Sequence, residues 1–407
     1  MARIIRKCRS CSSSQLISIL SLGSQYLSDF SRESYKPAKS PLDLILCRNC
    51  NLVQLKNTVS PTLLYTERYG YKSGINNTMK EELKEITDKG LKKLNANGKI
   101  SVLDIGSNDG TLLSFYPGDI FRVAFEPIKK FAKECRNYAN VVINDFFNYK
   151  SYRDKLKRKK MDVITAISCF YDIDNPNKFL NDIKKILDKN GIFVVQQNYL
   201  VSMLMNNAFD NIVHEHLEYY SLLSLENLLS RHGLEIFHVE ESVINGGSFR
   251  TFISHKESKP IQESVFRWRE HERALGLDKV KIYKDFAKRV NANRKELHKL
   301  IKNLKKKGKK IYIYGASTRG NTLLQFYQLN SKLIKAAAER NPEKWGKNIS
   351  SLNIPIISEK KARKDKPDYM LVLPWFFKDE FLEREKSYLE SGGRFIFPLP
   401  KIEIISS

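Results

Sequence analysis

The stretch KISVLDIGSNDGTLLSFY, residues 99–116, constrains the fold more than any other part of the chain. It runs from an apolar strand pattern through a glycine turn into the start of a helix. This order is typical of the first unit of a doubly wound α/β domain. Glycine can also stand in such a turn for backbone reasons alone, because it adopts left-handed conformations readily.

The turn has the spacing Asp104-x-Gly106-x-x-x-Gly110, which differs from the GxGxxG of dinucleotide-binding folds. Those folds use the closer glycines to bring backbone amides against a pyrophosphate. S-adenosylmethionine (SAM) has no phosphate that needs this spacing. The loop therefore favours SAM over NAD, and we expect Asp104, Gly106, Asn108, Asp109 and Gly110 to contact the cofactor.

Acidic and aromatic residues follow the next two apolar runs. VAFEP ends at Glu126 and Pro127, and VVINDFF brings Asp145 and Phe146 to the end of a third strand. A carboxylate at such a strand end accepts hydrogen bonds from ribose hydroxyls, and an aromatic face suits adenine. DVITAISCFYDI and GIFVVQQNYL supply two further strands. We therefore predict a class I methyltransferase-type, Rossmann-like SAM-binding domain over residues 73–255.

Four of the six cysteines form two CxxC pairs, Cys8 with Cys11 and Cys47 with Cys50. Two such knuckles can close a tetrahedral Zn²⁺ shell, and four thiolates leave no open position for a substrate. Disulfide bonds are an alternative, but a reducing cytoplasm argues against them. Thioredoxin-like redox motifs are another, although two facing motifs fit a metal better. We predict a structural zinc subdomain over residues 1–72.

The C-terminal third repeats the strand–glycine–helix pattern in KIYIYGASTRGNTLLQFY, residues 310–327. Gly315 and Gly320 have the spacing of a P-loop, but Asn-Thr follows where Lys-Ser/Thr is required, which disfavours a nucleotide triphosphatase. The runs YMLVLP and RFIFPL add strands, so residues 256–407 are predicted to form a second, smaller Rossmann-like domain. Connecting helices are expected before it, from 261 to 306.

The start of the helix in this repeat offers a place for a diphosphate. Backbone amides and one guanidinium could hold it there, from Ser317, Thr318, Arg319 and Asn321. A purely structural docking domain is the alternative.

The stretch NIVHEHLEYYS, residues 211–221, carries two of the seven histidines. It is not the zinc motif HExxH, because Glu218 stands where the second histidine is needed. The stretch follows the last strand of the predicted SAM domain, where ligands bind in α/β folds. We predict His216 as a general base, oriented by Glu215 or a carbonyl and supported by His214. A buried and a surface histidine without catalytic roles are the alternative.

Motifs along the whole chain resemble the SAM-dependent sugar C-methyltransferases. They are CRSC…CRNC, YGYKSGINNTM (69–79), VLDIGSNDGTLL, HEHLEYYS and YGASTRGNTLL, and the residues from 340 onward also resemble that family's C-terminal domain. The resemblance implies that the substrate is a nucleotide-linked keto-deoxysugar bound between the two Rossmann-like domains.

The resemblance also assigns single residues. The family's Tyr-x-Glu-His string corresponds to Val-His-Glu-His at 213–216, so the glutamate and the last histidine carry over while Val213 replaces the tyrosine. Asp172 replaces a family histidine. We expect Asp172, Asn198 and Val213 to contact the sugar. Tyr69 and Tyr71 match a family segment that closes over SAM and the substrate. The resemblance implies a catalytic and cofactor-binding role for Tyr71, with Ser73 near the methionine end of SAM.

C-methylation requires removal of a proton beside a ketone, after which the enolate attacks the SAM methyl group. One alternative is an O- or N-methyltransferase of a sugar nucleotide. A second is an NAD(P)-dependent sugar oxidoreductase that uses the GASTRG loop. A third is a non-catalytic scaffold that binds SAM or a nucleotide-sugar.

The net charge of +25 raises the question of nucleic-acid binding. The lysine runs at 155–160 and 302–310 have no stacking aromatics among them. Solvation of helices is the first interpretation of these runs, attraction of an anionic small molecule the second, and nucleic acid a distant third. No apolar run reaches the roughly 18 residues of a membrane span. We expect a cytoplasmic protein that is a monomer or a dimer.

Overall fold

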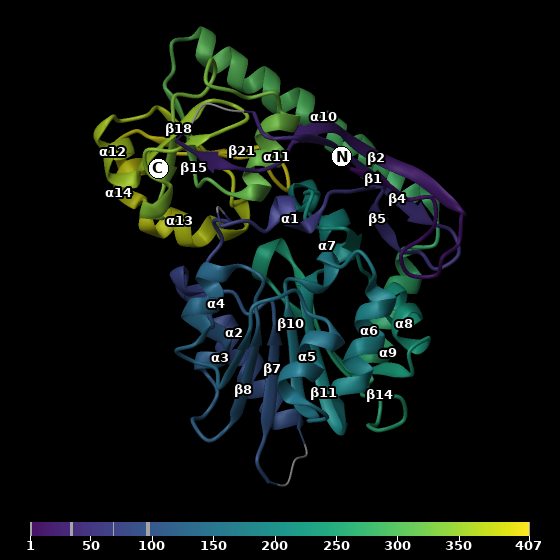
Figure 1. Cartoon of the computed structure of the whole chain (residues 1–407). Coiled ribbons are helices and arrows are strands. Elements are labelled where there is room, and N and C mark those ends of the chain that lie inside the picture. The colour runs from purple at the N-terminus through teal and green to yellow at the C-terminus, as the bar shows by residue number, and fades with distance from the viewer. Residues whose placement is uncertain (1, 33–35, 68, 95–97, 407) are drawn as a thin grey trace.

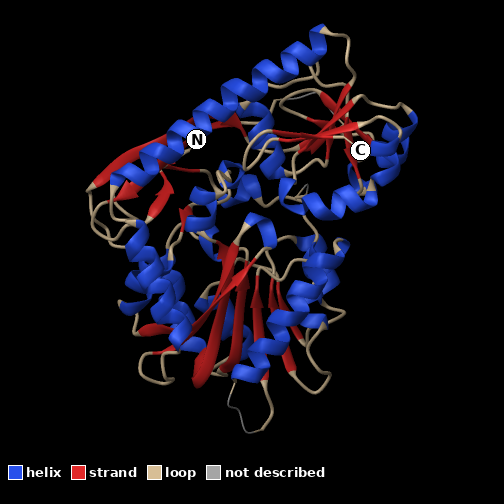
Figure 2. Cartoon of the chain, turned by 180° about the vertical axis from the view of Figure 1, so that it is seen from behind, coloured by secondary structure: helices blue, strands red, loops and turns tan. Residues whose placement is uncertain are grey.

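The computed structural model describes residues 2–32, 36–67, 69–94 and 98–406 and shows an α/β protein built on three main sheets (Figure 1). The N-terminal and C-terminal units lie side by side above the central unit in this view. Figure 2 shows the molecule from behind, with helices on either side of the central sheet. The predicted α/β class with two Rossmann-like units is confirmed.

A four-stranded antiparallel sheet follows the N-terminal cysteines. Its strands are β2 (Leu16–Tyr26), β4 (Lys39–Cys47), β5 (Val53–Leu55) and β12 (Glu218–Tyr219). Two short strands, β1 (Arg3–Ile4) and β6 (Asn57–Thr58), pair next to it, and helix α1 (Pro61–Leu64) follows. Strand β12 comes from the middle of the chain, and Tyr219 is paired with Val53.

The central sheet has the strand order β13-β14-β11-β10-β7-β8-β9. Its strands are β7 (Ser101–Ile105), β8 (Phe121–Phe125), β9 (Val141–Ile143), β10 (Met161–Ile167), β11 (Leu187–Asn198), β13 (Leu234–Ser242) and β14 (Ser248–His255). The neighbours from β9 to β11 are parallel, whereas β14 is antiparallel to both β11 and β13. The chain reverses its winding between β7 and β10, so a ligand crevice is expected at their carboxyl ends.

Helices cover both faces of this sheet. They are α2 (Asn77–Lys93), α3 (Thr111–Ser114), α4 (Lys129–Cys135), α5 (Tyr149–Leu156), α6 (Pro176–Ile186), α8 (Leu222–Ser230) and α9 (Glu263–Leu275). Helix α7 (Leu200–Met205) instead lies above the sheet and contacts α10 (Val280–Lys306) (Figure 1). Helix α6 illustrates the local rules: Asn175 caps its first turn and Pro176 fits that turn. Phe179, Ile183 and Ile186 are buried at helical spacing.

The C-terminal sheet has the order β21-β20-β19-β15-β16-β18-β17-β3. Its strands are β15 (Ile311–Tyr314), β16 (Ala337–Glu339), β17 (Asn348–Ile349), β18 (Ile354–Ser358), β19 (Tyr369–Val372), β20 (Arg394–Phe397), β21 (Glu403–Ile405) and the N-terminal strand β3 (Phe30–Ser31). The run from β18 to β20 is parallel. Helices α11 (Thr318–Phe326), α12 (Glu359–Lys364), α13 (Lys378–Arg384) and α14 (Lys386–Glu390) complete this unit.

Helix α10 (Val280–Lys306) connects the N-terminal and C-terminal units. Gly276, with φ 67°, ends α9 in the left-handed conformation, and α10 begins after it, as predicted for residues 261–306. The helix packs against β2, and its Asn293 amide donates to the Pro398 carbonyl at 2.9 Å. Neither α10 nor any other helix among the described residues is long and apolar enough to cross a membrane.

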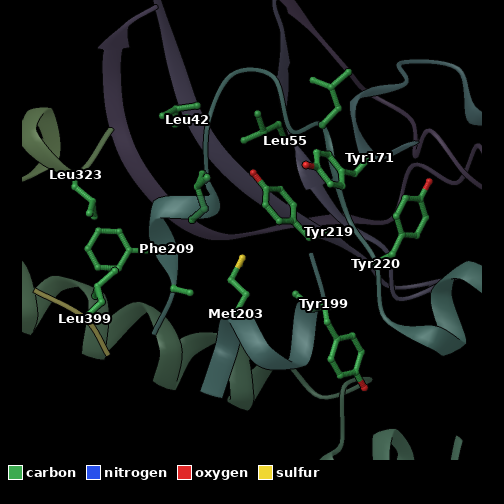
Figure 3. Packing of buried hydrophobic residues seen from close by; sticks show 14 of the residues in the cluster. Leu42, Leu55, Tyr171, Tyr199, Met203, Phe209, Tyr219, Tyr220, Leu323 and Leu399 are labelled. Atoms are coloured by element: carbon green, nitrogen blue, oxygen red, sulfur yellow. The ribbon is translucent and has the colours of Figure 1, made fainter. Parts of the chain in front are cut away.

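The three units share one hydrophobic core. It contains Leu42 and Leu55 of the N-terminal sheet, Tyr219 of β12, and Phe209 beside Leu323 and Leu399 of the C-terminal unit (Figure 3). Because β12 joins the N-terminal sheet and β3 joins the C-terminal sheet, the sheets do not follow the chain order strictly. The boundaries 1–72, 73–255 and 256–407 therefore stay predictions.

We expect Phe286→Ala to lower the free energy of unfolding by about 3–5 kcal/mol, because it empties a fully buried position on α10. Lys295→Ala, on the exposed side of the same helix, should change it by less than about 0.5 kcal/mol. Chemical denaturation of both variants measures these changes. Equal decreases in the free energy of unfolding would show that the buried face of α10 contributes no more to stability than its exposed face.

Candidate active site and metal centre

A cavity of about 350 Å³ opens at the carboxyl ends of β7, β8 and β10. Predicted cofactor residues in its lining are Tyr71, Ser73, Asp104, Gly106, Asn108, Glu126, Pro127, Asp145 and Phe146. Asp109 and Gly110, also predicted to contact the cofactor, lie next to this lining in the same loop. The residues thus meet at the sheet edge where the strand order reverses.

The glycine loop after β7 is a sharp turn. Gly106, Asn108 and Gly110 have φ angles of 72°, 51° and 80°, all in the left-handed region. A Cβ atom at Gly110 would also lie 2.8 Å from the Tyr138 ring and 3.2 Å from the backbone of Cys135. Glycine is therefore required at 110 for both conformation and space.

Glu126 fixes the loop and retains capacity to accept further hydrogen bonds. Its two carboxylate oxygens accept from the amides of Asn108 and Ile128, each at 2.8 Å. Burial raises the pKa of Glu126 to about 7. A carboxylate offers about four lone-pair sites, so this one can still accept hydrogen bonds from two hydroxyls of a ligand.

Two further carboxylates line the cavity. Asp104 accepts from the hydroxyl of Thr165 at 2.6 Å, and burial raises its pKa to about 7. Asp145 accepts from the Ser151 hydroxyl at 2.6 Å. Phe146 beside it keeps 41% of its surface exposed, so an apolar ring face is open at this end.

The segment before α2, residues 71–74, is hydrogen-bonded to the glycine loop. The Asn108 side chain accepts from the Ser73 amide at 3.0 Å and donates to the Tyr71 carbonyl at 3.1 Å. Asp109 accepts from the Gly74 amide at 2.9 Å. Asp109 thus acts on the segment that carries Tyr71 and Ser73, which explains its place outside the lining.

Tyr65 is a cavity residue that the sequence motifs do not indicate. Its hydroxyl donates to Asp172 at 2.7 Å, and its ring lies edge-on to Phe146 at 6.0 Å. The second oxygen of Asp172 is buried and has no hydrogen-bond partner among the described residues. Burial raises the pKa of Asp172 well above its usual range. The one sequence signal for Tyr65 is its place six residues before Tyr71.

His216 lies beyond the Asp172 end of the cavity. Its ring packs edge-on against Tyr171 at 4.3 Å. The Nδ1–H donates to the Asn211 carbonyl at 2.8 Å, so the lone pair lies on Nε2 and that nitrogen can accept a proton. Burial and the nearby charge of Arg319 lower the pKa of His216 to about 3.

The two residues before His216 differ in their surroundings. His214 is buried, and its Nε2–H donates to the Ser40 carbonyl of β4 at 2.9 Å. Glu215 is partly exposed, and burial raises its pKa to about 7. Burial raises the pKa of the cavity residues Tyr69 and Asp172, and the charge of Glu215 adds to both shifts.

Two predicted sugar contacts lie outside the cavity lining. Val213 is buried, with 1% of its surface exposed. Asn198 ends β11, and its side-chain oxygen is buried without a partner among the described residues. Their contact with a sugar stays a prediction.

The predicted diphosphate residues begin helix α11. The Ser317 hydroxyl caps the helix by accepting from the Gly320 amide at 3.0 Å. Arg319 is paired with Asp210 of the central unit, with Nε at 2.9 Å from the carboxylate. Asn321 is 1% exposed, and its side chain bonds to Ser28 at 3.2 Å. These polar groups already have protein partners, whereas Thr318 is half-buried in the first turn.

The four paired cysteines form the metal centre. The Sγ atoms of Cys8 and Cys50 are 3.6 Å apart, those of Cys11 and Cys47 are 3.5 Å apart, and all four lie within 4.8 Å of one another. Zn–S bonds of about 2.3 Å place tetrahedral ligands about 3.8 Å apart. A disulfide needs about 2.05 Å. The thiolates therefore fit structural Zn²⁺, as predicted.

Three family models match consecutive parts of the chain. A zinc-binding domain covers residues 8–65, a methyltransferase domain 75–239, and a C-methyltransferase C-terminal domain 243–400. C-methyltransferase NovU of Streptomyces niveus is 29% identical over 414 residues, which cover 100% of this chain and 98% of that protein. The chain is a SAM-dependent methyltransferase. The oxidoreductase and scaffold alternatives thereby lose their support.

Other similarities of this methyltransferase are limited to part of its length. A tRNA U34 carboxymethyltransferase of Campylobacter jejuni is 28% identical over 162 residues, 35% of this chain and 53% of that protein. The plantazolicin methyltransferase BpumL, solved with a pentazolic desmethylPZN analog and S-adenosylhomocysteine (SAH), has a TM-score of 0.36 and 14% identity. That match covers 45% of this chain and 87% of BpumL.

The residues of the cavity fit SAM. Its volume of about 350 Å³ lies in the range of small-molecule sites, roughly 300–1,000 Å³. Glu126 has free acceptor capacity for ribose hydroxyls, and Phe146 offers a face for adenine. SAM supplies the activated methyl group when it is bound.

We expect Cys50→Ser to lower the zinc content from one ion per chain toward zero, because a three-thiolate site binds Zn²⁺ far less tightly. Cys135→Ser, which changes a buried thiol outside the metal centre, should retain the ion. Metal analysis by mass spectrometry checks this. Equal zinc in wild type and Cys50→Ser would contradict the assignment.

We expect Glu126→Gln to weaken SAM binding about tenfold to a hundredfold, since hydrogen bonds to a charged acceptor contribute about 1.5–3 kcal/mol. Isothermal titration with SAH measures the effect. The exposed Asp154→Asn is the control and should bind SAH as wild type does. An unchanged affinity for Glu126→Gln would place the ribose elsewhere.

Proposed function

We propose that this methyltransferase acts on a nucleotide-diphospho-keto-deoxysugar and transfers the methyl group to a ring carbon. His216 removes a proton from the carbon next to the ketone, and the enolate carbon forms a bond to the SAM methyl group. The S–CH₃ bond breaks in the same step and releases SAH. The proposal divides the chain into a zinc subdomain (1–72), a SAM domain (73–255) and a substrate domain (256–407).

The proposal depends on one observation above all, the hydrogen bond between His216 and the carbonyl of Asn211. This bond leaves the lone pair of a neutral imidazole on Nε2, and the ring packs against Tyr171, the neighbour in the chain of the cavity residue Asp172. A fixed tautomer is what a general base requires. Of the two orienting groups predicted, a carbonyl rather than Glu215 is therefore the better supported.

The charges around His216 bear on when it can act. Arg319 helps to keep its pKa near 3 in the free protein. A substrate that carries a diphosphate would bring negative charge near Arg319 and oppose this effect. Glu215, next to His216 in the chain, has a pKa of about 7, and its ionised form could stabilise the imidazolium. We propose it as the acidic partner of the base.

Substrate contacts are proposed on both sides of the cleft. Asp172, Asn198 and Val213 belong to the sugar side, where Asp172 has an oxygen without a partner among the described residues. Ser317 and Thr318 belong to the nucleotide side, at the N-terminus of α11. His214 helps to hold the segment that carries His216, through its hydrogen bond to the Ser40 carbonyl. Tyr71 and Ser73 close the methyl-donor end.

Methylation of a hydroxyl or an amine is the second candidate. Asp172 favours it, because a carboxyl group with a raised pKa and a free oxygen can take a proton from a hydroxyl. That reaction would not exchange a proton on carbon.

The test is proton exchange in D₂O, with a panel of nucleotide-4-keto-sugars and without SAM, followed by NMR of the proton next to the ketone. We expect exchange by wild type and loss of at least about a hundredfold in His216→Asn, since general-base catalysis contributes roughly 10²–10⁴-fold. The exchange experiment is repeated with SAH present. Methyl transfer from SAM without proton exchange in either condition would favour the hydroxyl or amine acceptor.

The exchange rate should rise with pH through about 7. Glu215 is protonated below its pKa of about 7 and ionised above it, so the form that stabilises an imidazolium gains as pH rises. His216 is already neutral across this range, because its lowered pKa is about 3. We expect Glu215→Gln to exchange the proton more slowly than wild type, and we expect its exchange rate not to rise with pH near 7. If the exchange rate of Glu215→Gln still rises near pH 7, that rise belongs to the titration of another group.

A further inference from the structure

The short 3-10 helix η3 (Phe209–Asn211) of the central unit is docked on helix α11 of the C-terminal unit. The Phe209 ring meets Phe326 edge-on at 5.3 Å and Tyr327 at 5.9 Å. Figure 3 shows Phe209 beside Leu323 and Leu399, which belong to the same C-terminal unit. The first residue of η3 is thereby fixed by apolar contacts.

The second residue of η3, Asp210, is fixed by charge. It is 0% exposed, and one carboxylate oxygen accepts from Arg319 Nε at 2.9 Å and from the Trp375 indole at 3.1 Å. Arg319 Nη2 lies 2.6 Å from the same oxygen. A buried carboxylate of this kind requires its partners, because an unpaired buried charge is strongly destabilising.

The third residue of η3 holds the proposed base. The Asn211 carbonyl accepts from His216 Nδ1–H at 2.8 Å and from the Val213 amide at 3.1 Å. Asn211 is 2% exposed, so water does not substitute freely for either bond. The direction of this carbonyl decides which ring nitrogen of His216 carries the proton.

We infer that Arg319 and Asp210 are positioning residues: their pair fixes η3 so that the Asn211 carbonyl holds His216 in its base-competent tautomer. This inference rests on the proposed function of His216. It makes the base depend on a contact with the substrate domain. Arg319 then acts through Asp210 and Asn211, and not as a ligand of the diphosphate.

The remaining contacts of Arg319 agree with this role. Its Nη1 donates to the Asn245 carbonyl at 2.8 Å, and its guanidinium lies 4.6 Å from the centre of the Phe376 ring. Nε and Nη1 therefore donate to protein groups, and one face of the guanidinium is covered. The buried Nη2 lies against the Asp210 carboxylate, although it has no hydrogen bond among the described residues. A bidentate bond to phosphate needs two N–H groups that are free in the same plane.

Arg319→Lys is the test variant, because lysine retains the charge and cannot reproduce the forked contacts with Asp210 and Asn245. Asp210→Asn is the second variant, since it preserves shape and removes the charge. Arg340→Lys, at an exposed arginine of the same unit, is the matched control. All are compared as full-length protein with zinc and SAM, using the keto-sugar nucleotide that wild type exchanges fastest.

We expect kcat to fall about tenfold to a hundredfold in Arg319→Lys and Asp210→Asn, because a small misplacement of a catalytic group costs up to that much. KM should stay close to wild type, since neither residue contacts the substrate. The control should keep both constants. A raised KM with an unchanged kcat in Arg319→Lys would overturn the inference and make Arg319 a substrate ligand.

The ring nitrogens of His216 provide a second readout that needs no substrate. In protein labelled with ¹⁵N-histidine, long-range ¹H–¹⁵N spectra report which nitrogen is protonated, and His216→Asn assigns the signal. We expect a single Nδ1–H tautomer in wild type and a mixture in the two variants. An unchanged tautomer with unchanged kcat would overturn the inference.

This readout separates the two proposals. If wild type catalyses no exchange while the variants still shift the tautomer, the proposed function fails and the positioning contact stands. If wild type catalyses exchange and the variants match it in kcat and tautomer, the inference fails alone.

Discussion

The segment from Tyr199 to Ser221 is held from three sides, and the rest of the site depends on it. The Tyr199 hydroxyl donates to Glu272 of helix α9, and His214 donates to the Ser40 carbonyl of the N-terminal sheet. Asp210 is paired with Arg319 of the C-terminal unit. Apart from the partly exposed Arg319, each of these groups is buried, and leaving one without its partner costs about 1–3 kcal/mol or more. The segment therefore takes its conformation only when all three units are assembled.

The parts of the site that the sequence could predict are those with a local signature. The strand before Gly106 and the acid at Glu126 follow from spacing along the chain, and the four thiols follow from CxxC. The missing parts are contacts between distant residues. Tyr65 meets Asp172 across 107 positions, and the orienting group of His216 is a backbone carbonyl, which no residue type announces. Arg319 has the residue type of a phosphate ligand, yet its partner Asp210 becomes visible only in three dimensions.

The distribution of charge differs between the surface and the cavity. The lysine runs at 155–160 and 302–310 lie largely exposed, which agrees with solvation of the surface. The cavity instead holds carboxyl groups, and burial raises the pKa of Asp104 and Glu126 to about 7. A cationic sulfonium in this cavity favours their ionised forms and lowers those pKa values. A basic exterior with an acidic cavity thus suits an anionic substrate and a cationic cofactor together.

Under the proposed function, the arrangement also explains why the C-terminal unit is joined so firmly to the segment that carries His216. An enolate forms only if the base, the ketone and the methyl group are aligned at once, and alignment is where binding energy can be used most effectively. If the nucleotide binds at α11, the same helix that receives it also holds η3 through Phe209 and Asp210. A shift of α11 would then move the distant end of the substrate and the carbonyl behind His216 together. The sugar and its base would therefore keep their alignment when the units move relative to each other.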